Sequence, residues 1–400
     1  MIRRVTLAWQ SRGLLVVGKL MKDTIVRVAG GTAVLLAAAG LAAGTATYPA
    51  LAAGQGRASM AQPTRASSPS WQVVKKVPGE DFSAVVATGP NGGWAFGSGT
   101  PGADPRPTAW RRSGSSWTRV SFPGQREEVV ITAAATSASD VWAFTTGGAR
   151  SRALHWNGRA WTVARAFGLP IGGAAVISPG DVWVFGQAAP VSPVGFGAWH
   201  FDGRTWSHVA SGHGLGGGSG RSARDVWSFG GTDVAHWNGS SWSRTSVARL
   251  LPAALKSHLN DPAVTGVFEQ SADSVYATGN GNDEDDGGPM VLLHWNGHRW
   301  SKVAGGLFGF GVEGVQPIAP DGRGGLWIPM AGPEGGLNGR MLHYSGGHLT
   351  TVAIPGGPSR TSTATVAGIP GTSEALAGGF THAAGNAGLD DAGVLLEYES

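Results

Sequence analysis

Four consecutive carboxylates form the densest group of potential metal ligands in the sequence. Asp283, Glu284, Asp285 and Asp286 lie in the segment GNGNDEDDGGP, and hard cations such as Ca²⁺ bind several such oxygens at once. The run lacks the alternating acidic spacing of an EF-hand loop, and Leu293 stands where the last Glu of that loop is expected. We treat the four residues as candidate calcium ligands, with a solvated acidic loop as the alternative, and no other cofactor is indicated.

Histidines recur at one position, directly before an aromatic residue, in copies of the phrase LHWNGRAW (154–161). Equivalent positions of a repeat are spread apart in space, so we do not expect these side chains to converge on a metal. We interpret them as structural, or as hydrogen-bonding between neighbouring repeats, because a neutral imidazole both donates and accepts. No H-x-x-x-H or H-E-x-x-H pattern indicates zinc. The five are His155, His200, His236, His294 and His343.

Aspartate and tryptophan recur with the same period. Asp140, Asp181 and Asp225 each precede Val-Trp, and Asp273 occupies a slightly displaced place in a further copy. Short acidic side chains accept hydrogen bonds from turn N–H groups, so we interpret these aspartates as turn residues and not as catalytic acids. Every tryptophan after Trp9 falls on a repeat position. These rings are therefore expected to pack in the core, which leaves no spare platform for stacking a sugar.

Two phrases alternate along the chain and indicate paired strands. The first, typified by DVWAFG, has its central residue at 94, 142, 183, 227, 276, 327 and 376. The second is the LHWNGRAW phrase, in which Asn-Gly predicts a two-residue hairpin turn. With that turn, Leu154 would face Trp161. Where Trp replaces Leu, the same register predicts two cross-strand tryptophan pairs, Trp110 with Trp117 and Trp199 with Trp206.

These repeats predict an all-β fold, a seven-bladed β-propeller with four antiparallel strands per blade. The seventh repeat stops after VLLEYES (394–400), and its missing half, SWQVV, occurs at residues 70–74. A solenoid needs caps at two ends, whereas a propeller closes its ring with a shared blade. We therefore expect the N-terminal strand to complete the C-terminal blade.

The DVWAFG…LHWNGxxW repeats resemble those of secreted actinobacterial β-propeller proteins, grouped as kelch-like, galactose-oxidase-like or WD40-like. The resemblance covers residues 70–400 and implies the fold more than a function. Galactose oxidase needs a Cys–Tyr crosslink beside copper, and this sequence has no Cys. Sialidases use a Tyr nucleophile, but Tyr276, Tyr344 and Tyr398 all occupy repeat positions. Neither chemistry is expected here.

The first 52 residues have the pattern of a secretory signal. Lys22 and Arg27 precede an apolar stretch at 31–43, and Ala50 and Ala52 fit the small-x-small rule of signal peptidase. An uncleaved membrane anchor is the alternative, although the stretch is short for a bilayer span. Because Met21 begins the pattern, the true start could lie there. We divide the chain into a leader (1–52), a flexible linker (53–69) and a propeller (70–400).

The net charge of +4 comes from the leader, since residues 1–52 carry +5 and the remainder −1. Without a basic patch, nucleic acid is not an expected partner. We predict a secreted, monomeric, non-enzymatic scaffold that binds an extracellular protein or glycan, with membrane contact only if the leader is retained. The alternative is a polysaccharide hydrolase or lyase that uses carboxylates on the loop face. Its candidates are 283–286, Asp390 and Asp391, with Arg150 and Arg152 in another loop of that face.

Overall fold

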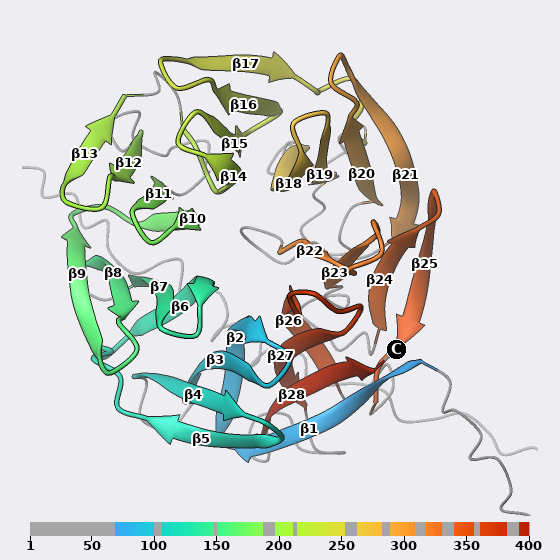
Figure 1. Cartoon of the computed structure of the whole chain (residues 1–400). Helices are drawn as coiled ribbons and strands as arrows, with labels where there is room; N and C mark the ends of the chain where they lie inside the picture. Colours follow the sequence, from blue (N-terminus) through green and yellow to red (C-terminus); the bar gives the residue numbers. More distant parts are fainter. Residues whose placement is uncertain are drawn as a thin grey trace, which may run out of the picture. The chain divides into compact units, whose positions relative to one another are not determined.

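The repeated phrases fold into seven four-stranded antiparallel sheets that follow one another around a ring (Figure 1). The prediction of a seven-bladed β-propeller is therefore confirmed. None of the residues that the structure describes forms a helix long and apolar enough to cross a membrane. The computed structural model describes residues 69–99, 106–147, 150–186, 197–210, 214–252, 262–281, 289–308, 317–329, 340–355, 361–381 and 392–399.

Each blade has four strands, named a to d from the centre of the ring outwards. In the order a to d, the blades are β2 (Glu80–Gly89), β3 (Gly92–Gly99), β4 (Pro107–Ser113) and β5 (Ser116–Val120); β6 (Glu128–Ser137), β7 (Asp140–Gly147), β8 (Ser151–Trp156) and β9 (Trp161–Phe167); β10 (Ile171–Ser178), β11 (Asp181–Gly186), β12 (Ala198–Phe201) and β13 (Trp206–Val209); β14 (Gly218–Ser222), β15 (Asp225–Gly230), β16 (Asp233–Trp237) and β17 (Trp242–Ser246); β18 (Ala263–Ser271), β19 (Ser274–Asn280), β20 (Pro289–Trp295) and β21 (Trp300–Phe308); β22 (Ala319–Pro320), β23 (Leu326–Pro329), β24 (Arg340–Ser345) and β25 (His348–Ala353); β26 (Thr361–Gly368), β27 (Ala375–Thr381), β28 (Ala392–Glu399) and β1 (Ser70–Pro78).

Composition changes from the inner to the outer strands in the way that burial requires. Strand b is covered by neighbouring blades on both faces, and β11, DVWVFG, is buried at every position. Strand d lies at the rim, and β17, WSRTS, is mostly exposed. Each predicted repeat centre lies in a strand b, so the period of the sequence is the period of the blades.

The c–d hairpins differ from the prediction by two residues. Asn157 accepts hydrogen bonds from the N–H groups of Arg159 and Ala160 through its side chain, so the turn spans four residues. Trp156 then pairs directly with Trp161, and Leu154 with Val163. The predicted pairs were therefore wrong: in the second and third blades the side chains of Asn157 and Asp202 stabilise a longer turn, and in the first blade Ser113 pairs with Ser116. The partners are Trp110 with Arg119, Phe201 with Trp206 and Trp199 with His208.

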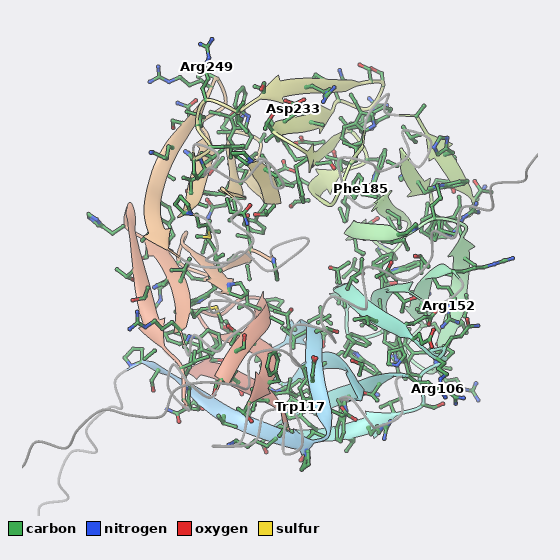
Figure 2. All side chains as sticks on the ribbon, turned by 180° about the vertical axis from the view of Figure 1, so that it is seen from behind. Arg106, Trp117, Arg152, Phe185, Asp233 and Arg249 are labelled. Atoms are coloured by element: carbon green, nitrogen blue, oxygen red, sulfur yellow. The ribbon has the colours of Figure 1, made fainter. Side chains whose placement is uncertain are left out.

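The apolar core lies between blades, not within one central cluster. The strand-b aromatic residue of one blade packs against the strand-c aromatic residue of the next, as Trp183 does against Trp237 at 5.6 Å between ring centroids. The other such contacts span 4.7–5.8 Å. Figure 2 shows side chains filling the blades around the ring, while Arg249 points outward from its rim. Six seams are thereby closed by aromatic pairs, which are Trp94–Trp156, Trp142–Phe201, Trp183–Trp237, Trp227–Trp295, Tyr276–Tyr344 and Trp327–Tyr398.

The seventh seam, between the last and first blades, is closed differently. β1 pairs with β28 and completes the seventh blade, as the split repeat predicts. At this seam the strand-b position is Leu376, and the facing strand-c position of the first blade is Arg112. The Arg112 guanidinium bonds Glu397 of β28 at 2.5 Å, and both side chains are at most 12% exposed. A buried ion pair thus stands where the other seams have two aromatic rings.

We predict that breaking this ion pair destabilises the ring more than breaking an exposed one. Arg112→Met leaves Glu397 buried without its partner and should lower the free energy of unfolding by about 3–5 kcal/mol, whereas Arg112→Met/Glu397→Leu should recover most of the loss. Arg244→Ala, which removes the exposed pair with Asp233, is the control and should cost under about 1 kcal/mol. Urea unfolding gives the free energy of unfolding of the wild type and of the three variants. Equal losses for Arg112→Met and Arg244→Ala would contradict the prediction.

Candidate functional site

The recurring aspartates and histidines form one structural unit in each of several blades. His155 Nε2 lies 2.6 Å from Asp140 Oδ1, and the imidazole stacks on Trp142 with centroids 4.4 Å apart. The His faces the Trp across strands b and c, and the Asp lies at the a–b turn two residues before the Trp. The same pairing joins His200 to Asp181 and His236 to Asp225.

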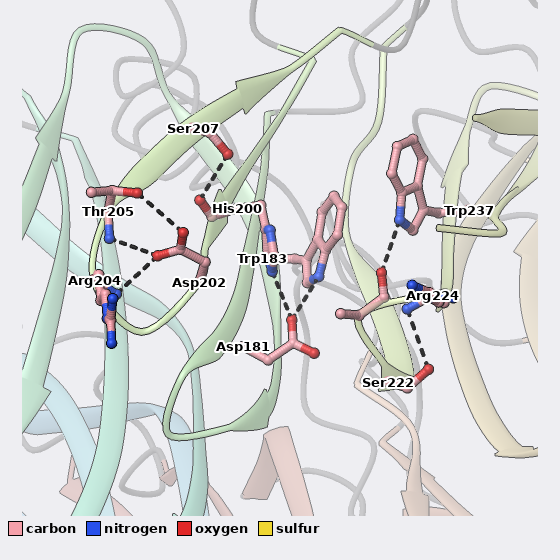
Figure 3. A network of polar contacts seen from close by, with 11 residues as sticks. Asp181, Trp183, His200, Asp202, Arg204, Thr205, Ser207, Ser222, Arg224 and Trp237 are labelled. Carbon is pink, nitrogen blue, oxygen red and sulfur yellow. Dashed lines mark hydrogen bonds and ion pairs between the residues drawn. The ribbon is translucent and has the colours of Figure 1, made fainter. Parts of the chain in front are cut away.

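This pairing revises two interpretations of the sequence. The histidines bond within their own blade, not to a neighbouring one, and Asp140, Asp181 and Asp225 accept from histidine. In the third blade, Asp181 accepts bonds from both His200 and the indole N–H of Trp183 (Figure 3). The unit holds the a–b turn, strand b and strand c together, so these side chains serve to stabilise the fold.

The sixth blade builds the same unit from a different aspartate. Gly325 stands at the usual Asp position, and Asp321 reaches it from the other side of the turn to bond His343 at 2.8 Å. A Cβ at Gly325 would come 2.3 Å from Asp321 Oδ2, so only glycine leaves this space. Burial disfavours the charged form of Asp321, but bonds from His343 and from two backbone N–H groups hold the pKa of its carboxyl below the ordinary value.

The fifth blade departs from the unit. Ser274 occupies the usual Asp position, and Asp273 lies one residue before it in the a–b turn, displaced as the sequence indicates. His294 bonds the Ser274 hydroxyl at 3.0 Å and stacks on Tyr276 in place of a tryptophan. With no carboxylate beside it, burial lowers the pKa of His294 below its ordinary value.

The structure tests only some of the predictions about charged residues in loops. Asp283, Glu284, Asp285 and Asp286 lie outside the described residues, as do Asp390 and Asp391. Arg150 is described and exposed. Arg152 was wrongly assigned to a loop, since it lies in β8 and is buried against Glu128, whose Oε1 accepts from Arg152 Nε at 2.7 Å. Every tryptophan of the described chain is buried or half-buried, and the described residues contain no group of three or more acidic or His side chains placed to hold a metal.

Glu269 is the least expected ionisable group in the structure. It lies on β18, opposite the residue that precedes Tyr276 of the neighbouring strand, and its side chain is buried at 6% exposure. When it is ionised, neither carboxylate oxygen has a hydrogen-bond donor among the described residues, whereas the protonated carboxyl can donate to Asp225. Every other blade has a small or apolar residue at this position, namely Ala87, Ala135, Val176, Gly220, Pro320 and Gly368.

The surroundings of Glu269 favour its protonated form. Burial raises the pKa of Glu269 to about 8, and the nearby Asp225 carboxylate of the preceding blade adds to this rise, while Arg221 opposes it. Asp225 is itself bonded to His236. A carboxyl group and a carboxylate therefore face each other across the seam between the fourth and fifth blades. Pairs of carboxyl groups whose pKa values lie far apart occur at catalytic sites and also at structural ones. Sequence reasoning missed this pair, although a charged residue in a row of small ones was a signal.

No protein-family model matches the sequence, and no curated protein matches it. Solved structures share the fold. YCF48 bound to D1 peptide has a TM-score of 0.53 at 10% identity, over 82% of this chain and 97% of that chain. The WD40 repeats of RRP9 give 0.54 at 12% identity, over 83% and 99%. The GH74 xyloglucanase from Xanthomonas campestris gives 0.52 at 15% identity, over 78% and 53%. At these identities the likeness establishes the β-propeller fold alone.

We predict that Glu269 makes the stability of the protein fall with rising pH. Its pKa is about 8 in the folded state against an ordinary value of 4.5, so between these values the folded state binds more protons than the unfolded state. Stability from this group is complete below about pH 4.5 and is lost as pH rises to about 8. Glu269→Gln removes this dependence and should be the more stable protein at about pH 8.5.

Melting temperatures between about pH 5 and pH 8.5 measure this effect. The difference between Glu269→Gln and wild type should grow by about 2 °C or more across that interval, a shift that corresponds to about 1 kcal/mol in a large domain. Glu127→Gln, at an exposed carboxyl, is the matched control and should follow wild type. Parallel curves for wild type and Glu269→Gln would refute the prediction.

Proposed function

We propose that this protein is a secreted, non-enzymatic β-propeller that binds an extracellular protein or glycan. The proposal rests on one observation: the recurrent polar and aromatic side chains bond to one another and so hold the fold together. The Asp–His pairs, the stacked tryptophans and the Arg112–Glu397 and Arg152–Glu128 ion pairs all bond within or between blades. They build a rigid ring, and such a ring serves recognition by presenting loops and rims.

Similar proteins support the binding interpretation. One of them is described as bound to a peptide, and another consists of WD40 repeats. A seven-bladed propeller has two faces and a rim at which a partner can bind without any change in the blades. The leader, with its charged start, apolar centre and small-residue end, favours secretion, and the run at 283–286 is a candidate calcium site.

A hydrolase or lyase that acts on polysaccharide is the second candidate. The likeness to a GH74 xyloglucanase favours it, because the same fold supports glycosidic cleavage in that enzyme. Glycosidases use two carboxylates about 5–10 Å apart. The Glu269–Asp225 pair does not suit this role, since Glu269 is buried and Asp225 is engaged by His236. The carboxylates for such an activity would have to come from the acidic loop segments.

A binding screen with a parallel activity assay separates the two functions. Purified protein is tested on arrays of peptides, glycans and cell-wall fragments with and without Ca²⁺, and the same glycans are assayed for release of reducing ends. We expect saturable binding without cleavage. Cleavage that is lost in Asp283→Asn/Asp285→Asn would overturn the non-enzymatic proposal. A rise in melting temperature with Ca²⁺ that is lost in the same variant would support the calcium site.

A further inference from the structure

We propose that the seam between the first and second blades holds an anion site that takes a carboxylate side chain of a protein partner. This inference rests on the proposed binding function and names the partner's chemistry. The site is formed by the chain after β5 and by the β8–β9 hairpin. Arg159 of the hairpin turn lines the cavity, and Arg111 on β4 lies over the ring of Trp156, which also lines it.

Arg111 stands where four other blades have a histidine bonded to an aspartate. It faces Trp94 across β3 and β4, as His155 faces Trp142 in the next blade. The first blade has Gly92 at the usual Asp position, so its turn provides no acid for the guanidinium. Arg111 lies over the rings of Trp94 and Trp156, at 5.7 and 5.4 Å. Within the described residues it has no carboxylate partner, unlike Arg112 beside it.

A cavity of about 200 Å³ opens next to the ring on which Arg111 lies. Its lining contains donors and apolar groups but no carboxylate. The indole nitrogens of Trp156 and Trp161 are buried, so these two rings act as apolar walls, and Arg159 is the charged donor of the lining. Arg159 is exposed in the turn, where its backbone N–H bonds Asn157. The lining residues are Val120, Ser121, Pro123, Trp156, Arg159, Ala160 and Trp161.

Size and charge together select the ligand. Sites for whole small molecules have volumes of about 300–1,000 Å³, so this cavity fits one side chain better than a sugar chain. Guanidinium groups bind carboxylates through paired N–H donors, and the indole walls exclude water, which strengthens such bonds. An acidic residue of a protein partner supplies the carboxylate that Arg159 and Arg111 lack.

Fluorescence anisotropy with a labelled (Gly-Glu)₄ peptide tests the site on the full chain. Binding should be saturable, weaken as NaCl is raised, and be absent for (Gly-Gln)₄. Arg159→Gln and Arg111→Gln should each weaken it by about tenfold or more, as expected for loss of a charge-assisted hydrogen bond. Arg159→Lys should fall between. Arg204→Gln, at the corresponding turn position of the third blade, is the matched control and should bind as wild type does.

Three outcomes would overturn the proposal: no saturable binding of (Gly-Glu)₄, equal binding of (Gly-Gln)₄, or an equal loss in Arg204→Gln and Arg159→Gln. If inorganic phosphate binds in an Arg159-dependent way but the peptide does not, the protein partner is also excluded. Melting temperatures show that each variant is folded, and Arg159→Gln decides if Arg111→Gln fails to fold. A partner found in the screen above together with failure here would reject the carboxylate site and leave the binding function standing.

Discussion

The packing of one blade's strand-b ring against the next blade's strand-c ring is the interaction on which the whole molecule depends. A single four-stranded sheet cannot bury both of its faces, so each blade needs two neighbours. The apolar clusters accordingly straddle the seams, as in the cluster that joins Trp94 and Phe96 of the first blade to Trp156 and Trp161 of the second. A ring is the arrangement in which no blade lacks a neighbour. The His–Asp pair then holds strand c and the a–b turn beside the ring that packs, so the polar contacts are secondary to the aromatic ones.

Departures from the repeat are more informative than the repeat itself. Where the last seam has Leu376, the facing position has Arg112, and Glu397 replaces the usual histidine. Where Gly325 removes the aspartate, Asp321 replaces it. These changes compensate one another. Arg111 and Glu269 are different, because neither has a bonded partner of opposite charge among the described residues. Uncompensated charges in an otherwise well-matched scaffold are the residues at which a role beyond folding is best sought.

The fold could be predicted because one strongly periodic signal determines it. Trp142, Trp183 and Trp227 recur with the blade, and the divided seventh repeat indicates closure. The hairpin register could not be predicted as easily, since it depends on whether the Asn157 side chain bonds turn N–H groups two and three residues on. The Asp140–His155 contact was also missed, because Asp140 is explained as a turn residue and His155 as a structural residue of the repeat, and neither explanation requires the other residue. Their common signal was that both follow the same period. Glu269 and Asp225 lie in different repeats, so only the seam brings them together.

The pairing of β1 with β28 has a consequence for how the molecule comes into being. Most contacts lie within a blade or between neighbouring blades and can form as the chain emerges, but this ladder joins segments about 300 residues apart. β1 is made first and has no partner until the last strand is complete. A chain interrupted anywhere before β28 would therefore expose an unpaired strand at one end and an uncovered blade face at the other, both of which favour aggregation. The ring thus acts as a check on completeness, since β1 gains its partner strand, and the first blade its second neighbour, only when β27 and β28 have been made.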